Sequence, residues 1–265
     1  MLLLILGREK SLSKAEAESV FGEINVINDE AVQAKENSSA NYDRLGGVIK
    51  VAEIISSDAG DLVNDITEYI NHKVEDGKIN FGLSYYGFDK TNNQLGINVK
   101  KRLKKLGRSV RYISAKDGKA LNAAAVIYNK LTSKGCEIIL AKNPGTGKIT
   151  LSRTLHVQNI NEYSKRDYDK PCRDRKVGML PPKLSQIMTN LSYAKSGTLV
   201  VDPFCGSGGL LMEASLMGYD TAGSDISAKM IDCTKTNFDW LLECYPAAKK
   251  PESLEIMDAR QFKAP

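Results

Sequence analysis

A glycine-rich stretch near the end of the chain carries the residue types best suited to bind a small ligand. Residues 200–210 read VVDPFCGSGGL, in which an apolar run ends at Asp202 and three glycines follow, at positions 206, 208 and 209. Open parallel sheets bind ligands at the carboxyl ends of their strands, and glycines there let the backbone approach a ligand closely. The stretch therefore predicts a strand, a ligand-binding turn and a helix.

Three aspartates, each at the end of a predicted strand, indicate which ligand the turn would bind. Asp202 ends the first strand, Asp225 the second and Asp258 the third. Asp202 would repel a pyrophosphate but attract an ammonium group, Asp225 can accept hydrogen bonds from ribose hydroxyls, and Asp258 lies within reach of an adenine edge. An ammonium, a ribose and an adenine together predict S-adenosylmethionine. Taken singly, Asp225 or Asp258 is equally well explained as a solvated loop residue.

A nicotinamide dehydrogenase is the weakest alternative for this turn. Gly206 and Gly208 match the first spacing of the pattern Gly-x-Gly-x-x-Gly, but Leu211 stands where the third glycine belongs. NAD would also leave Asp202 facing a phosphate. No histidine lies near Cys205 in the sequence, so we expect Cys205 to be a small packing residue and not a nucleophile.

The elements that must position this turn form an α/β pattern of three modules. Residues 179–265 predict a first helix and then a β-α-β-α-β order, the first half of a doubly wound parallel sheet. Residues 161–178 lack an apolar period and predict a linker. Residues 1–58 predict a small βαββ unit, and residues 59–160 predict a second block of alternating helices and strands.

A run of positive charge precedes the last module. Between Leu95 and Arg111 there is no acidic residue, while Leu95, Val99, Leu103 and Leu106 recur at helical spacing and predict a buried stripe. A solvated helix face usually mixes charges of both signs, so this segment predicts a surface that binds nucleic-acid phosphates. The residues of this predicted surface are Lys100, Lys101, Arg102, Lys104, Lys105, Arg108 and Arg111.

The composition excludes several other classes of protein. The 265 residues are 42% hydrophobic and 26% charged, which is ordinary for a core-forming protein, and no stretch approaches the roughly 18 apolar residues of a membrane helix. The five cysteines form no Cys-x-x-Cys pair, so we expect neither a disulfide scaffold nor a zinc site, and a reducing cytoplasm fits. The two histidines lack partners at metal-ligand spacing, so no metal is expected. The sequence does not indicate an oligomeric state.

Two long motifs give the chain a family resemblance. DPFCGSGG resembles the Asp-Pro-x-Cys-Gly-Ser-Gly turn of methyltransferases that modify exocyclic amino groups of nucleic-acid bases. RDYDKPCRDRKVGMLPPKLSQIM resembles the segment that joins the RNA-binding THUMP domain to the catalytic domain in THUMP-containing tRNA guanosine N2-methyltransferases, the archaeal type acting near tRNA position ten. The resemblance covers about residues 78–258, and residues 1–58 match by layout only.

The resemblance implies a fold, a reaction and a donor site. Residues 1–58 would form a ferredoxin-like domain, residues 59–160 a THUMP RNA-binding domain, and residues 179–265 part of a Rossmann-like class I methyltransferase domain. The reaction implied is methyl transfer from S-adenosylmethionine to the N2 amino group of a guanosine in tRNA, in the cytoplasm. The residues that would line the donor are Asp202, Cys205, Gly206, Ser207, Gly208, Asp225, Asp258 and Ala259, with GMLPPKL closing over it.

The chain departs from this family at the catalytic motif. In the family, an Asp/Asn-Pro-Pro-Tyr motif after the fourth strand holds the target amino group, and no such tetrapeptide occurs in this sequence, which ends in MDARQFKAP. We therefore expect a fragment of a longer protein that is inactive by itself, and no catalytic residue is named. A DNA amino-methyltransferase and a non-catalytic RNA-binding protein with a vestigial donor site are the other interpretations.

Overall fold

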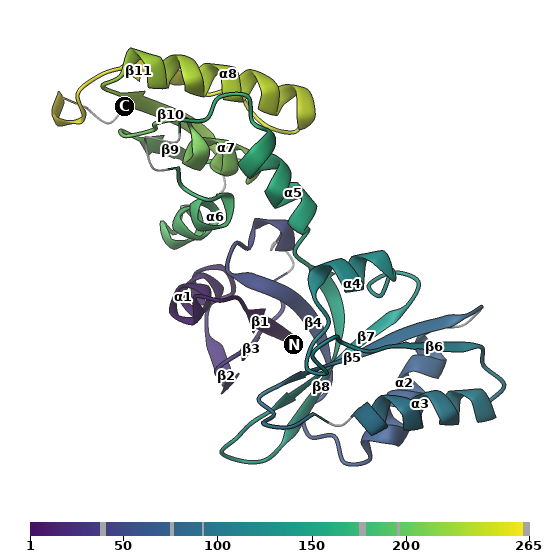
Figure 1. Cartoon of the computed structure of the whole chain (residues 1–265). Helices are drawn as coiled ribbons and strands as arrows, with labels where there is room; N and C mark the ends of the chain where they lie inside the picture. Colours follow the sequence, from purple (N-terminus) through teal and green to yellow (C-terminus); the bar gives the residue numbers. More distant parts are fainter. Residues whose placement is uncertain (38–40, 75–76, 92, 175–178, 195–196, 262–265) are drawn as a thin grey trace. The chain divides into compact units, whose positions relative to one another are not determined.

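The computed structural model describes residues 1–37, 41–74, 77–91, 93–174, 179–194 and 197–261 (Figure 1). The chain divides into two compact units. Unit 1 comprises Met1–Tyr42 and Val48–Asn159, and unit 2 comprises Asp43–Gly47 and Ile160–Pro265. The boundary near residue 160 falls where the sequence placed the start of a linker.

Unit 1 is built on one eight-stranded sheet of order β2-β3-β1-β4-β8-β7-β5-β6. Its strands are β1 (Leu2–Leu6), β2 (Ile24–Asn28), β3 (Ala31–Ala34), β4 (Val48–Ser56), β5 (Ile79–Tyr86), β6 (Val110–Ile113), β7 (Cys136–Lys142) and β8 (Ile149–Val157). β5 pairs in parallel with β6 and β7, and the other pairings are antiparallel. Because β4 pairs with β8, the sheet continues across the module boundary predicted at residue 58. The assignment of residues 1–58 and 59–160 to separate ferredoxin-like and THUMP domains stays a prediction.

The helices of unit 1 are α1 (Lys10–Phe21), α2 (Leu62–Lys73), α3 (Asn93–Lys105) and α4 (Ala123–Tyr128), and a 3-10 turn spans Tyr42–Arg44 at the boundary of the two units. α3 is the predicted basic helix, and Leu95, Val99 and Leu103 bury its apolar stripe against α2 and β5. The prediction was wrong for Leu106, which is 54% exposed. The helix ends at Lys105, and Gly107 at a φ of 78° turns the chain out of the helical path.

Unit 2 has the predicted β-α-β-α-β order. Its elements are α5 (Ile160–Ser164), a π-helix (Lys165–Asp169), α6 (Pro182–Leu191), β9 (Leu199–Asp202), α7 (Gly209–Leu216), β10 (Asp220–Asp225), α8 (Ala228–Cys244), β11 (Ser253–Ile256) and a 3-10 turn (Ala259–Gln261). The three strands are parallel in the order β11-β10-β9. Leu211 of α7 packs with Phe238 and Leu241 of α8 in one apolar cluster. The α/β fold class and the half of a doubly wound sheet are therefore confirmed.

The segment predicted as an irregular linker begins with helical structure. α5 and the π-helix occupy residues 160–169, and residues 175–178 of the predicted linker lie outside the described residues. Tyr163 and Arg166 are buried in this segment, and each forms a hydrogen bond with a polar side chain far away in the sequence, in α6 and α7. Apolar periodicity cannot reveal a helix that is anchored by polar side chains.

Candidate functional site

The three aspartates predicted from the sequence meet at one edge of the unit 2 sheet. β9, β10 and β11 run in parallel, with Asp202 opposite Gly223 and Asp225 opposite Ile256. Asp258 follows β11 at the same end, because the N–H of Met257 donates to the carbonyl of Asp225 over 3.0 Å. The carboxyl ends of parallel strands are where such sheets bind ligands.

The glycine turn that follows β9 needs its two glycines for different reasons. Gly206 and Gly208 both have positive φ values, 54° and 82°. A Cβ added at Gly208 would lie 2.8 Å from the side chain of Thr234 on α8, whereas one at Gly206 would meet no atom closer than the carbonyl of Phe204 at 3.9 Å. Gly208 therefore lets α7 and α8 approach each other, and Gly206 leaves free space next to its Cα at the turn.

Asp225 is tied to this turn by its carboxylate. One oxygen accepts the N–H of Gly206 over 3.0 Å, and the other accepts the N–H of Ser227 over 2.9 Å. Each carboxylate oxygen keeps a further lone pair, so Asp225 can still accept hydrogen bonds from a ligand. These bonds fix the position of the glycine turn relative to the end of β10.

Asp202 lies in an environment that favours a cationic ligand. Its carboxylate accepts the N–H of Phe204 over 2.9 Å. Burial raises the pKa of Asp202 above its ordinary value, and the nearby charge of Asp225 raises it further. A positively charged group beside Asp202 would offset both effects, whereas a phosphate would add a third negative charge.

Asp258 and Ala259 end the site beyond β11. The carboxylate of Asp258 accepts from the Arg260 backbone N–H and the Arg260 side chain, each over 3.0 Å, and these bonds lower the pKa of Asp258. The Arg260 side chain is 88% exposed, and such an exposed pair is weak. Asp258 can therefore exchange this partner for a ligand, and its predicted role at an adenine edge stays a prediction, as does that of Ala259.

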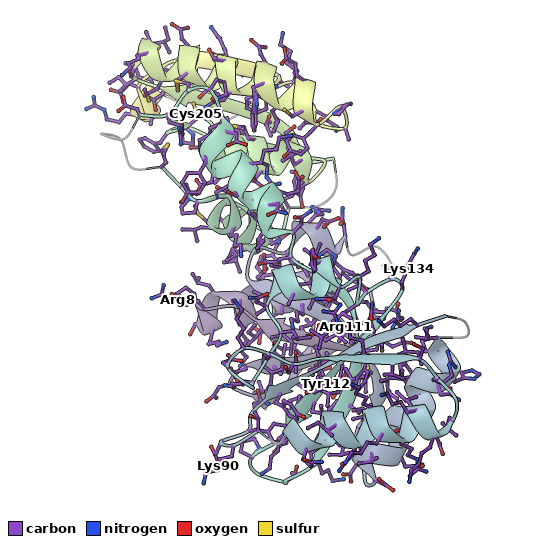
Figure 2. All side chains as sticks on the ribbon, turned by 45° about the vertical axis from the view of Figure 1, so that its right-hand side comes forward. Arg8, Lys90, Arg111, Tyr112, Lys134 and Cys205 are labelled. Carbon is purple, nitrogen blue, oxygen red and sulfur yellow. A yellow bond between two sulfur atoms is a disulfide. The ribbon has the colours of Figure 1, made fainter. Side chains whose placement is uncertain are left out.

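Cys205, labelled in Figure 2, is a buried residue of the glycine turn. Burial raises the pKa of its thiol to about 11, so the thiol stays protonated near neutral pH. Its sulfur lies 3.9 Å from the hydroxyl of Thr234. This environment favours a packing role and not a nucleophile.

The residues that pack behind the glycine turn were not predicted from the sequence. Cys172 and Cys233 form a disulfide, although no disulfide scaffold was expected from the sequence. Next to this disulfide, the amide of Asn237 donates to the carbonyls of Ser207, over 2.9 Å, and of Cys172, over 3.0 Å. The two cysteines are 61 residues apart and match no spacing motif, so no local signal could have indicated the pair.

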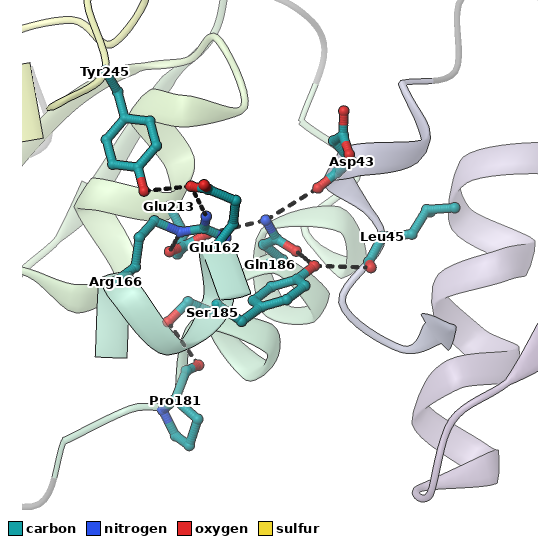
Figure 3. Close-up of polar contacts among 10 residues, drawn as sticks. Asp43, Leu45, Glu162, Arg166, Pro181, Ser185, Gln186, Glu213 and Tyr245 are labelled. Atoms are coloured by element: carbon teal, nitrogen blue, oxygen red, sulfur yellow. Dashed lines mark hydrogen bonds and ion pairs between the residues drawn. The ribbon is translucent and has the colours of Figure 1, made fainter. Parts of the chain in front are cut away.

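A second missed feature is a buried polar network that supports α7 (Figure 3). Arg166 donates to Glu213 of α7 over 2.6 Å, and Gln186 of α6 donates to the same carboxylate over 3.0 Å. Tyr163 donates to Gln186 over 2.6 Å and lies 3.3 Å from the carbonyl of Leu45. Each buried charge therefore has hydrogen-bonding partners, as a buried ion pair requires.

The predicted phosphate-binding surface is mostly exposed on unit 1. Lys101, Lys104 and Lys105 of α3 are exposed, as is Arg111 of β6, which Figure 2 labels. Lys100 is partly buried, and Arg102 is exposed and donates to Asn64 of α2. Lys101, Arg102 and Lys105 line a hollow of about 510 Å³.

Arg108 forms hydrogen bonds within unit 1. It donates to the side chain of Asn71 over 2.8 Å and also to the carbonyl of Val74. Its guanidinium therefore holds the end of α2, and Arg108, like Lys100, is only partly exposed.

No helix among the described residues is long and apolar enough to span a membrane. Across the same described ranges, no group of three His, Cys, Asp or Glu side chains is arranged to hold a metal ion.

The parallel strands, the glycine turn and the acidic strand ends define unit 2 as a Rossmann-like ligand-binding unit. Within it, residues 171–241 match the model of the UPF0020 family, described as an RMKL-like methyltransferase domain. The chain is 37% identical over 120 residues to the tRNA (guanine(10)-N2)-dimethyltransferase of Methanocaldococcus jannaschii, a match that covers 43% of this chain and 33% of that protein. It is 32% identical over 124 residues to the enzyme of that name from Pyrococcus abyssi, covering 45% of this chain and 37% of that protein.

These matches confirm the resemblance predicted from the two sequence motifs. The matched part spans about a third of the length of these two relatives. The fold of the chain is also similar to the crystal structure of TrmN from Thermus thermophilus, with a TM-score of 0.53 at 15% identity over 98% of this chain and 73% of that one.

Proposed function

We propose that this chain binds S-adenosylmethionine in unit 2 and tRNA through unit 1, as part of an enzyme that methylates the N2 amino group of a guanosine in tRNA. The relatives named as tRNA (guanine(10)-N2)-dimethyltransferases support the reaction. The observation that carries the proposal is the pair of carboxylates, Asp202 and Asp225, beside the free space next to the Cα of Gly206. A tRNA substrate would place the protein in the cytoplasm.

The residues at the strand ends fit this methyl donor. Asp202 would bind the ammonium of its amino-acid part, because two nearby carboxylates favour a cation. Asp225 would accept hydrogen bonds from the ribose hydroxyls through its remaining lone pairs, and Asp258 with Ala259 would lie along the adenine. Ser207 and Gly206 would line the donor with their backbone. The bound donor supplies an electrophilic methyl group on a sulfonium sulfur.

The guanosine amino group that accepts the methyl group must be made more reactive by the protein. The lone pair of an exocyclic amine is delocalised into the base, so the amine is a weak nucleophile. Hydrogen-bond acceptors placed at the amine hydrogens draw the lone pair out of conjugation. The protein's other contribution to catalysis is to align the amine nitrogen with the methyl group of the donor. Unit 1 would hold the tRNA by backbone phosphates through the exposed cations of α3 and Arg111, which gives affinity without sequence specificity.

Calorimetry with the purified 265-residue chain tests the donor. We expect saturable binding of S-adenosylmethionine and no saturable binding of NADH. Binding of NADH alone would overturn the proposal in favour of a dehydrogenase. Competition between tRNA and duplex DNA for the same chain tests the second partner, and a preference for DNA would favour the DNA amino-methyltransferase.

A further inference from the structure

A short segment before α6 is fastened to the donor unit at several points. We call residues 170–174 the strap. Lys170 at its start is 3% exposed, Cys172 at its centre is disulfide-bonded to Cys233 of α8, and Asp174 at its end pairs with Lys229 of α8 over 2.7 Å. The strap therefore lies along α8.

Asn237 joins the strap to the glycine turn. It is fully buried at 0% exposure. Its amide oxygen accepts the N–H of Cys172 over 2.9 Å, and its amide nitrogen donates to the carbonyls of Cys172 and Ser207 over 3.0 and 2.9 Å. Both amide hydrogens are used, so the orientation of this side chain is set by the strap on one side and the turn on the other.

Asn237 and Thr234 hold two consecutive carbonyls of the turn. They lie three residues apart on one face of α8. The hydroxyl of Thr234 donates to the carbonyl of Gly206 over 2.8 Å, and Asn237 holds the next carbonyl, that of Ser207. Because a trans peptide directs its C=O and N–H oppositely, fixing the carbonyl of Gly206 toward α8 directs the N–H of Ser207 away from it.

We propose that Asn237 is a positioning residue of the donor site and that the Cys172–Cys233 disulfide keeps it in place by holding the strap. This inference rests on the proposed function of unit 2. Donor affinity then depends on the redox state of the two cysteines. A dithiol reductant breaks the S–S bond by transferring two electrons and two protons, which leaves two thiols on the protein and a disulfide on the reductant.

Reduction would weaken the strap because it removes the covalent link to α8 and leaves the hydrogen bonds of Asn237 to Cys172 and one ion pair. The Asp174–Lys229 pair has an exposed lysine and contributes little. Loss of the cross-link restores the chain freedom that a 61-residue separation allows. The apparent donor affinity is proportional to the fraction of molecules in which the strap is bound to α8, so it falls when that fraction falls.

The experiment measures S-adenosylmethionine affinity by calorimetry on the full 265-residue chain. Four forms are compared: the oxidised chain, the chain reduced with dithiothreitol, oxidised Asn237→Ala, and reduced Asn237→Ala. We expect binding to weaken about tenfold in Asn237→Ala, the effect of losing about one net hydrogen bond, and about threefold on reduction. The two effects should be non-additive, since both act through the strap.

Controls separate this inference from its alternatives. Thr236→Ala changes an exposed residue of the same helix and should bind as the unchanged chain does. The double variant Cys172→Ser/Cys233→Ser should match the reduced chain and lose its response to dithiothreitol. Comparing the unchanged chain in its two redox states requires no substitution, so a variant that fails to fold does not block the test.

Two results would overturn the inference. Equal donor affinity in the oxidised and reduced chain, or additive effects of reduction and Asn237→Ala, would leave the strap without a role in binding while the proposed function stands. Absence of donor binding by the oxidised, folded chain would instead refute the proposed function and this inference together.

Discussion

Replacing Gly208 by alanine tests whether the turn depends on close packing against α8. Gly208 has a φ of 82°, a left-handed conformation that costs an L-residue about 1–2 kcal/mol. Its added Cβ would lie 2.8 Å from the Thr234 side chain, and relieving such overpacking costs about 1–3 kcal/mol. Movement of Thr234 would also disturb its 2.8 Å bond to the carbonyl of Gly206. We expect Gly208→Ala to lower the free energy of unfolding of unit 2 by about 2–5 kcal/mol.

Gly206→Ala is the matched control for this substitution. Gly206 is also left-handed, but its added Cβ would meet nothing closer than 3.9 Å, so only the conformational cost of about 1–2 kcal/mol remains. Urea denaturation followed by the fluorescence of Trp240, the single tryptophan of the chain and a residue of α8, reports on unit 2. Equal destabilisation by the two substitutions would refute the packing argument. If Gly206 forms the ligand-facing backbone, its alanine variant should be folded and yet lose donor affinity.

Three further predictions test the charges. Asp202→Asn should weaken S-adenosylmethionine binding about 10- to 100-fold. Because the pKa of Asp202 is raised, the donor affinity of the unchanged chain should fall as the pH drops through that pKa. Calorimetry should show no such fall for the variant. Glu213→Ala removes the closer of two ion-pair partners of the buried Arg166 and leaves Glu162 at 4.0 Å. It should lower the unfolding free energy by about 3–5 kcal/mol in urea denaturation, whereas Arg166→Met/Glu213→Leu should recover most of that loss. Lys104→Ala should weaken tRNA binding and reduce the slope of log affinity against log salt concentration by about 0.7–0.9, measured by fluorescence anisotropy. Arg108→Ala should leave this slope unchanged and destabilise unit 1. Equal slopes for all forms would show that α3 is not part of the tRNA-binding surface.

The elements of unit 2 could be predicted because their signals are local. A strand, a glycine turn and a helix follow one another within residues 199–216, and the apolar run, Asp202 and the glycines mark each in turn. The same holds for the buried stripe of α3 up to Leu103. The prediction failed at Leu106 because helical spacing does not show where a helix ends; α3 ends at Lys105, and Gly107 turns the chain away.

The supporting contacts could not be predicted because their partners are distant. Arg166 and Glu213 are 47 residues apart, and Asn237 bonds to Cys172 across 65 residues. Arg166, Glu213 and Asn237 each resemble surface residues in their own segments, since polar side chains are usually exposed. Only the fold reveals that they are buried, and burial makes their pairing necessary.

This division between local and distant residues follows from how a parallel sheet builds a site. The groups that would touch a ligand come from strand ends and the turn after the first strand, so sequence order alone brings Asp202, Gly206 and Asp225 to one edge. The groups that fix the turn come from a helix behind it, where Thr234 and Asn237 hold its carbonyls. Substitutions in the first set should therefore weaken binding by removing ligand contacts directly. Substitutions in the second set should weaken binding without removing any ligand contact, because they release the backbone that presents those contacts.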